Sequence, residues 1–135
     1  MLVVRGRPPG RESELRTSTF SGVVYGDPVL ANDEVVVNEV FFAPCARTYW
    51  HRHTDGQLLF IHTGHGVVVT RAGEIAEVRG GDVIWVPPGE EHWHGGSTTT
   101  LLAHTAISLG PTIWLEEVPE EDYLAATRDL GPELH

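Results

Sequence analysis

The stretch His51-Arg52-His53-Thr54-Asp55-Gly56-Gln57 decides the fold of this 135-residue chain. In an extended strand, side chains two residues apart project to the same side, so His51 and His53 point together. Asp55-Gly56 is a strong hairpin signal, and it folds the chain back so that Gln57 begins the return strand beside the two histidines. The stretch therefore predicts two adjacent strands that direct two imidazoles and one amide oxygen at a common point.

A second stretch, Pro87-Pro88-Gly89-Glu90-Glu91-His92, adds a third imidazole. Its prolines stiffen a turn, and we expect this turn to deliver His92 to the same end of the fold. Three imidazoles and one oxygen suit manganese, iron, cobalt, nickel or zinc, and they suit calcium and magnesium poorly. Such a set leaves coordination positions open, as a catalytic metal requires. The predicted ligands of one divalent transition metal are His51, His53, Gln57 and His92.

Short apolar runs, separated by many of the 15 glycines and nine prolines, surround these stretches. We expect a turn at Gly26-Asp27-Pro28 and another, exposed one at Gly64, flanked by His62 and His65. Short strands with such regular punctuation predict an all-β sandwich or barrel. The expected strands cover residues 34–42, 47–53, 57–63, 66–71, 75–78, 83–86, 91–95 and 98–108.

The chain length corresponds to one domain. Residues 20–118 are expected to form the β domain, after a polar arm at 1–19 that carries four arginines and at most one strand. Pro119 and the three acids that follow it are the expected opening of a short helix, so residues 119–135 are assigned to a C-terminal helix and tail.

Composition excludes several classes of function. The formal net charge of −10 argues against a nucleic acid or an anionic membrane as partner. All nine basic residues are arginines, which excludes a lysine Schiff base. Cys45 is the only cysteine, so an intrachain disulfide and a cysteine-rich zinc site are excluded. Without a long apolar segment or the pattern of a signal peptide, the chain is expected to be cytoplasmic.

The spacing of these residues resembles that of the cupin superfamily. The first cupin motif corresponds to residues 45–64 and the second to residues 81–96. The resemblance implies a small antiparallel double-sheet β-barrel of the jelly-roll type. Cys45 stands where the motif opens with glycine, so the entry turn need not have a left-handed backbone. Gln57 replaces a glutamate, and its neutrality leaves the charge of the metal uncompensated, which favours Lewis-acid chemistry over redox cycling.

A narrower resemblance extends over residues 46–57, 91–95 and 102–107. These stretches are similar to small cupins that include bacterial manganese-dependent hydroxynitrile lyases and cupins associated with carboxymuconolactone decarboxylases. The resemblance implies manganese as the metal and His104 as the general base that takes the hydroxyl proton of a cyanohydrin. It also implies a homodimer. Ser108 departs from the pattern, because the lyases carry a glutamine at that position.

Two other functions remain open at this stage. One is a metal-dependent cupin dioxygenase that acts on a small phenolic or dicarbonyl compound, and the other is a cupin that binds a small molecule without catalysis. Each of the three functions requires a small, mainly apolar pocket. The residues expected to line it are Asn38, Val40, Phe42, Thr48, Leu59, Ile61, His94, Leu102 and Ser108.

Overall fold

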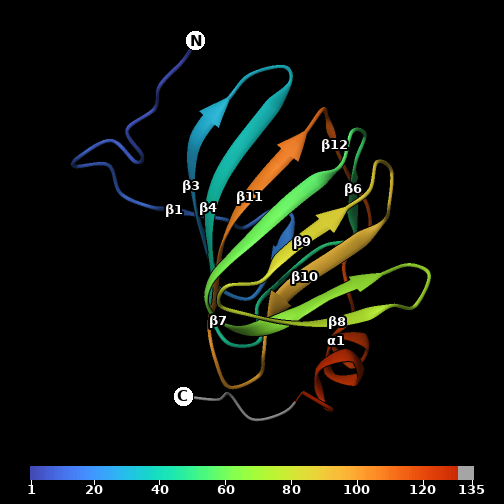
Figure 1. Ribbon diagram of the computed structural model, residues 1–135. Helices are drawn as coiled ribbons and strands as arrows, with labels where there is room; N and C mark the ends of the chain where they lie inside the picture. Colours follow the sequence, from blue (N-terminus) through green and yellow to red (C-terminus); the bar gives the residue numbers. More distant parts are fainter. Residues whose placement is uncertain (131–135) are drawn as a thin grey trace.

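The structure, a computed structural model, describes residues 1–130 as a curled antiparallel β-sheet with one short helix (Figure 1). This confirms the prediction of an all-β fold of the barrel type with a C-terminal helix. The elements are β1 (Glu14–Leu15), β2 (Phe20–Ser21), β3 (Val24–Ala31), β4 (Val35–Phe42), β5 (Arg47–Thr48), β6 (His51–His53), β7 (Gln57–Thr70), β8 (Ile75–Arg79), β9 (Val83–Val86), β10 (His92–Gly96), β11 (Leu102–Leu109), β12 (Thr112–Trp114) and α1 (Glu120–Thr127).

The strands form two facing halves that share β7. The main order is β1-β3-β4-β11-β7-β10-β5-β2, and β6 lies between β10 and β12. The first residues of β7 pair with β9 and β11, and its last residues pair with β8 and β10. Side chains that point inward from the two halves pack together as a buried hydrophobic cluster, which includes Val24, Phe42 and Leu59.

The course of β7 corrects the expected turn at Gly64. The strand continues for 14 residues through this position. Gly64 has a φ of 94°, and a Cβ there would collide with the carbonyl oxygen of Leu101. The glycine therefore lets one strand pass from one half of the sheet to the other, which only a residue without a side chain permits here. His65 is buried and lies 2.6 Å from Glu77, whereas His62 is exposed.

The expected turn at Gly26-Asp27-Pro28 is also absent from the described chain, because β3 runs straight through it. The register between β3 and β4 shifts between Pro28 and Leu30. Proline cannot donate to a neighbouring strand, and a register irregularity near the edge of a sheet is a position where it is tolerated.

The opening of the first cupin motif keeps a left-handed backbone although its residue is a cysteine. Cys45 has a φ of 72°, in the left-handed region that the motif's usual glycine would adopt. The tight connection from β4 to β5 requires this conformation, and the cysteine adopts it despite its Cβ.

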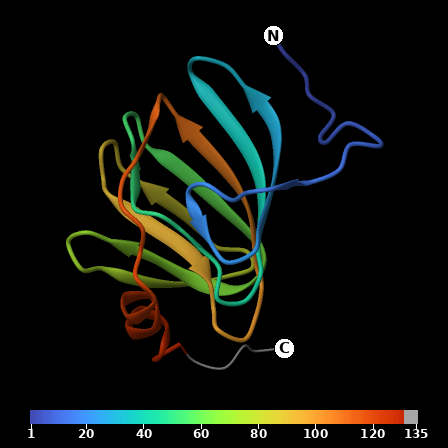
Figure 2. The same ribbon diagram turned by 180° about the vertical axis from the view of Figure 1, so that it is seen from behind.

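The two ends of the chain differ in their contacts. In the arm, β1 pairs with β3, whereas Met1–Val4 is exposed and leads away from the barrel (Figure 2). Helix α1 packs on the barrel through buried Tyr123, whose hydroxyl donates to the carbonyl oxygen of Gly96 at 2.6 Å. The tail expected after the helix lies, from residue 131 on, outside the described residues.

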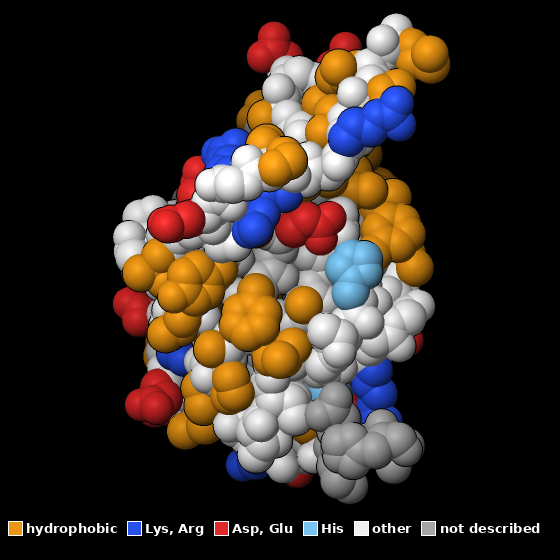
Figure 3. Space-filling model, turned by 90° about the vertical axis from the view of Figure 1, so that its left-hand side faces the viewer, with side chains coloured by type: hydrophobic (Ala, Val, Ile, Leu, Met, Phe, Trp, Pro, Cys, Tyr) orange, Lys and Arg blue, Asp and Glu red, His pale blue; other side chains and the backbone are white. Residues whose placement is uncertain are grey.

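Exposed hydrophobic side chains are a notable feature of the surface. Hydrophobic side chains are gathered over one face of the body below the arm (Figure 3), and the strands carry exposed Tyr25, Phe41, Phe60 and Trp85.

The homodimer implied by the resemblance stays a prediction. Within residues 1–130, no helix is both long and apolar enough to cross a membrane.

Candidate metal centre

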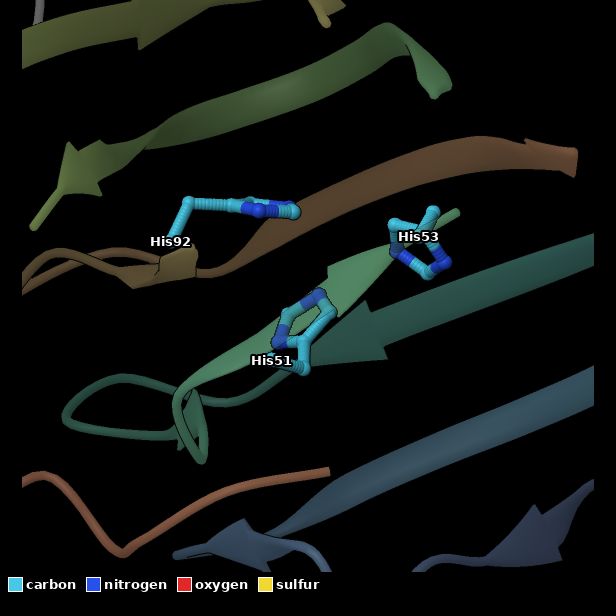
Figure 4. A group of neighbouring side chains, drawn as sticks. All are labelled: His51, His53 and His92. Atoms are coloured by element: carbon cyan, nitrogen blue, oxygen red, sulfur yellow. The ribbon is translucent and has the colours of Figure 1, made fainter. Parts of the chain in front are cut away.

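Strand pairing brings three of the predicted ligands together. In the register of β6 and β10, His51 lies directly opposite His92. His53 follows two residues later on the same side of β6. Figure 4 shows the three rings converging, with His92 reaching toward the other two from its own strand. The chain turns after β6, but the hairpin expected at Asp55-Gly56 is wrong, because β6 pairs with β10 and β12 and not with β7. The proline turn before His92 leads into the strand that pairs with β6.

The three imidazoles are close enough to share one ion. One ring nitrogen of each lies within 4.8 Å of those of the other two. The ring centroids of His51 and His92 are 4.3 Å apart, and those of His51 and His53 are 5.1 Å apart. All three residues are buried, with exposed fractions of 4% or less.

Each ring is oriented through its Nδ1 atom. Nδ1 of His51 lies 2.9 Å from the carbonyl oxygen of Tyr49, and Nδ1 of His92 lies 3.0 Å from that of Glu90. Nδ1 of His53 lies 2.9 Å from the Thr112 hydroxyl. A proton on each Nδ1 leaves the lone pair on Nε2 free for a metal, as is common for metal-binding histidines. Consistently, Nε2 of His53 is buried without a hydrogen-bond partner among residues 1–130.

Burial keeps these imidazoles neutral. Desolvation, together with the neighbouring His92, lowers the pKa of His53 to about 4, and desolvation lowers the pKa of His92 to about 4. Burial and the nearby histidines also hold the pKa of His51 well below its ordinary value. Because a metal binds the neutral ring, the donor set fits a divalent transition metal at neutral pH.

Gln57 lies beside the triad at the start of β7. Its Oε1 is 3.0 Å from Nε2 of His92, and its Nε2 donates to Oγ of Ser108 at 3.0 Å. Because Nδ1 of neutral His92 already donates to a carbonyl oxygen, its Nε2 carries a lone pair. Two electron-pair donors thus face each other, an arrangement typical of two ligands that share a cation.

A second pair of histidines lies next to the triad. Nε2 of His104 is 3.1 Å from Nδ1 of His94, and Phe42 packs against both rings. Within the described chain, Nδ1 of His104 and Nε2 of His94 are buried without partners. Burial lowers the pKa of His104 to about 4 and holds that of His94 well below its ordinary value. His104 follows a bulge in the pairing of β11 with β7, at Ala103 and His104, and bulges often redirect side chains at functional sites.

These groups open onto one small cavity of about 110 Å³. Two members of the triad, His51 and His53, line it together with Gln57 and His104. Of the nine residues expected in the pocket wall, five line the cavity: Asn38, Val40, Thr48, His94 and Ser108.

The other four expected pocket residues need correction, since they lie instead in the buried hydrophobic cluster: Phe42, Leu59, Ile61 and Leu102. The physical reason is their position along the strands. On β4, Val36, Asn38 and Val40 line the cavity. Phe42 is on the same face, but it lies at the end of the barrel that the hydrophobic cluster fills. Alternation predicts the face of a sheet that a side chain joins, but not its position along the barrel.

The sequence reasoning missed five residues of the wall: Phe20, Val36, Ala106, Thr112 and Trp114. Thr112 and Trp114 lie on β12, opposite His53 and His51 respectively. The ring centroids of Trp114 and His51 are 4.7 Å apart. The alternation of Thr112 and Trp114 was the available signal, but the three-residue strand that carries them is too short for a periodicity to be recognised.

Comparison with known proteins agrees with this geometry. The family model of the cupin domain matches residues 38–106, and the chain belongs to the cupin family. A protein of Granulicella tundricola named (R)-mandelonitrile lyase is 41% identical over 111 residues, which are 77% of this chain and 85% of that protein.

Solved structures show the same fold. A cupin-like protein from Thermotoga maritima is similar with a TM-score of 0.84 and 32% identity, over 91% of this chain and 99% of that one. The polyketide cyclase RemF from Streptomyces resistomycificus is similar with a TM-score of 0.70 at 18% identity, over 91% of this chain and 92% of that one. The second likeness concerns the fold alone.

Proposed function

We propose that this cupin is a metal-dependent lyase of the hydroxynitrile-lyase type. His51, His53, Gln57 and His92 would hold one divalent transition metal, with manganese favoured over iron, zinc, nickel or cobalt. The observation that carries the proposal is the neutral, buried His104 in the wall of the cavity that His51 and His53 also line. The 41% identity with a protein named (R)-mandelonitrile lyase supports it.

A bound metal would supply a Lewis acid that polarises the hydroxyl of a cyanohydrin. Gln57 is neutral, and the three histidines are held neutral by burial, so the protein ligands would leave the positive charge of the metal in place.

His104 is the base in this proposal. Its ring is neutral at pH 7. In the tautomer whose Nε2–H donates to Nδ1 of His94, the Nδ1 of His104, which has no partner among residues 1–130, carries the lone pair that accepts the hydroxyl proton. The electrons of the O–H bond form the carbonyl of the aldehyde, and the C–C bond breaks so that its electron pair leaves with cyanide. Transfer of the proton from His104 to cyanide completes the cycle. The contact of His104 with His94 fixes the ring in place during both transfers.

The test compares the manganese-loaded protein with His104→Ala and His51→Ala, using racemic mandelonitrile and elemental analysis. We expect His104→Ala to keep its metal and lose turnover at least about a hundredfold, because general-base catalysis contributes on that scale. His51→Ala should lose both metal and turnover. Full turnover by His104→Ala would refute the assignment of the base. Oxygen consumption with catechols, without cyanide release, would instead identify a dioxygenase.

A further inference from the structure

An arginine of the N-terminal segment reaches the inside of the half-barrel. Arg16 follows β1, and its backbone N–H donates to the carbonyl oxygen of Val24 at 2.8 Å. Its guanidinium lies over Gly26 of β3. A Cβ at Gly26 would stand 2.5 Å from Nε of Arg16 and 3.0 Å from its Cζ. The absence of a side chain at Gly26 therefore makes the space that the guanidinium occupies.

The space around Arg16 adjoins the metal cavity. Arg16 lines a hollow of about 340 Å³ that shares Phe20, Asn38, Val40 and Trp114 with the wall of the metal cavity. The segment between β1 and β2 crosses the open side of the half-barrel (Figure 2). A molecule bound in the metal cavity would thus extend toward this guanidinium.

Two polar atoms of residues that line this hollow lack partners within residues 1–130. They are Nε of Arg16 and Oδ1 of Asn38, and both are buried. The guanidinium contacts the carboxylate of Glu14 at 3.3 Å through NH2, so its other N–H groups are not used by this ion pair. Arginine presents five N–H donors in a planar fork that matches a carboxylate. Buried polar atoms in native proteins normally have partners, and a ligand would supply them here.

We propose that Arg16 binds a carboxylate at the far end of the substrate, and that Asn38 accepts a hydrogen bond from a neighbouring donor of the same molecule. The substrate class is a small organic acid whose reacting hydroxyl or carbonyl group lies at the metal centre. The identity of that reacting group rests on the proposed function, whereas the anion site rests on the hollow itself. The arm residue thereby sets specificity in a chain whose overall charge is strongly negative.

The test is isothermal titration calorimetry of the manganese-loaded protein. The probes are 4-(hydroxymethyl)benzoate and the longer 4-(hydroxymethyl)phenylacetate, with benzyl alcohol as the uncharged reference. We expect at least one carboxylate to bind about tenfold tighter than benzyl alcohol, since a charge-assisted contact to a carboxylate is among the stronger hydrogen bonds. Equal affinity for all three probes would overturn the proposal.

Three variants identify the group responsible. Arg16→Gln should lose the preference for the carboxylate and retain the affinity for benzyl alcohol. Gly26→Ala keeps the charge but displaces the guanidinium, so it should weaken the preference in a protein that still folds. Arg11→Gln is the matched control, because Arg11 also contacts Glu14, at 3.1 Å, but does not line the hollow. A preference that persists in both Arg16→Gln and Gly26→Ala would overturn the proposal.

Failure of this inference is distinguishable from failure of the proposed lyase activity. A carboxylate preference that depends on Arg16, in a protein without cyanide release, would keep the anion site and reject the lyase. Conversely, if mandelonitrile is cleaved, the ratio of kcat/KM for 4-carboxymandelonitrile to that for mandelonitrile should fall about tenfold in Arg16→Gln. An unchanged ratio would reject the anion site.

Discussion

The amide of Gln57 donates from Nε2 to Oγ of Ser108 at 3.0 Å, across directly paired positions of β7 and β11. This contact holds the amide of Gln57 in the orientation in which Oε1 faces His92. Ser108, the departure from the hydroxynitrile-lyase pattern, therefore orients the neutral member of the proposed metal set.

Replacing Ser108 with alanine should weaken metal binding. Without its acceptor, the amide of Gln57 can rotate and present Nε2, which is not a ligand. We expect the dissociation constant for manganese to rise about tenfold, the low end for loss of a group that orients a ligand. Competition with a chelating dye measures it. Ser108→Thr retains the hydroxyl and serves as control, and an unchanged affinity in Ser108→Ala would show that the contact is dispensable.

Thr112 should support metal binding by orienting the ring of His53, as Ser108 orients Gln57. His51 and His92 are oriented by backbone carbonyl oxygens, which mutation cannot remove, whereas His53 depends on a side-chain hydroxyl. Thr112→Val preserves shape and removes the acceptor, so manganese affinity should fall about tenfold or more, while Thr112→Ser should stay close to wild type. Equal affinities of the two variants would contradict this role.

The stability of the metal-free protein should fall in mild acid. The folded-state pKa values of His53, His92 and His104, each about 4, lie below the ordinary value of 6.5. The unfolded chain therefore binds more protons between these limits, so the stabilisation is complete above about pH 6.5 and is lost progressively toward pH 4. For one histidine, each tenfold difference in proton affinity between the folded and unfolded chains corresponds to about 1.4 kcal/mol. Urea unfolding at pH 7.5, 6 and 5 measures the trend, and stability independent of pH would contradict it.

Cys45→Gly should stabilise the fold. The cysteine holds a φ of 72°, which costs about 1 kcal/mol for a residue with a Cβ. Its side chain is exposed, so its removal sacrifices little packing. We expect a gain of somewhat less than about 1 kcal/mol, because glycine also gains freedom in the unfolded chain. The midpoint of urea unfolding reports the gain. Cys45→Ala retains the strained backbone and should show no gain, so equal stabilisation by both variants would refute this explanation.

Local signals predicted much of the site. The alternation in His51-Arg52-His53 and the proline turn before His92 are properties of neighbouring residues. The Asp55-Gly56 signal predicted a turn but not the strand pairing around it, because β6 pairs with β10 and β12 rather than with β7. The pairing of β6 with β10 then brings these two short segments side by side. The same locality explains why the inward faces of β4 and β11 were identified, although the height of Phe42 and Leu102 along the barrel was not.

The features that sequence reasoning missed depend on distant parts of the chain. Gly64 is required by the carbonyl of Leu101, 37 positions further along the chain, so its sequence context resembles an ordinary turn. Trp114 and Thr112 gain their roles only because β12 pairs with β6. The guanidinium of Arg16 lies over Gly26 in the space that the missing side chain leaves, and a polar arm by itself gives no sign of such a contact.

The central claim is that a metal in this cavity supports cleavage of a cyanohydrin. The most direct measurement is the rate of cyanide release from mandelonitrile by the protein stripped of metal and then reloaded with manganese. We predict no enzymatic release from the stripped protein and recovery on reloading, in proportion to the manganese bound. Release at the same rate with and without metal, or none from the fully loaded protein, would contradict the account.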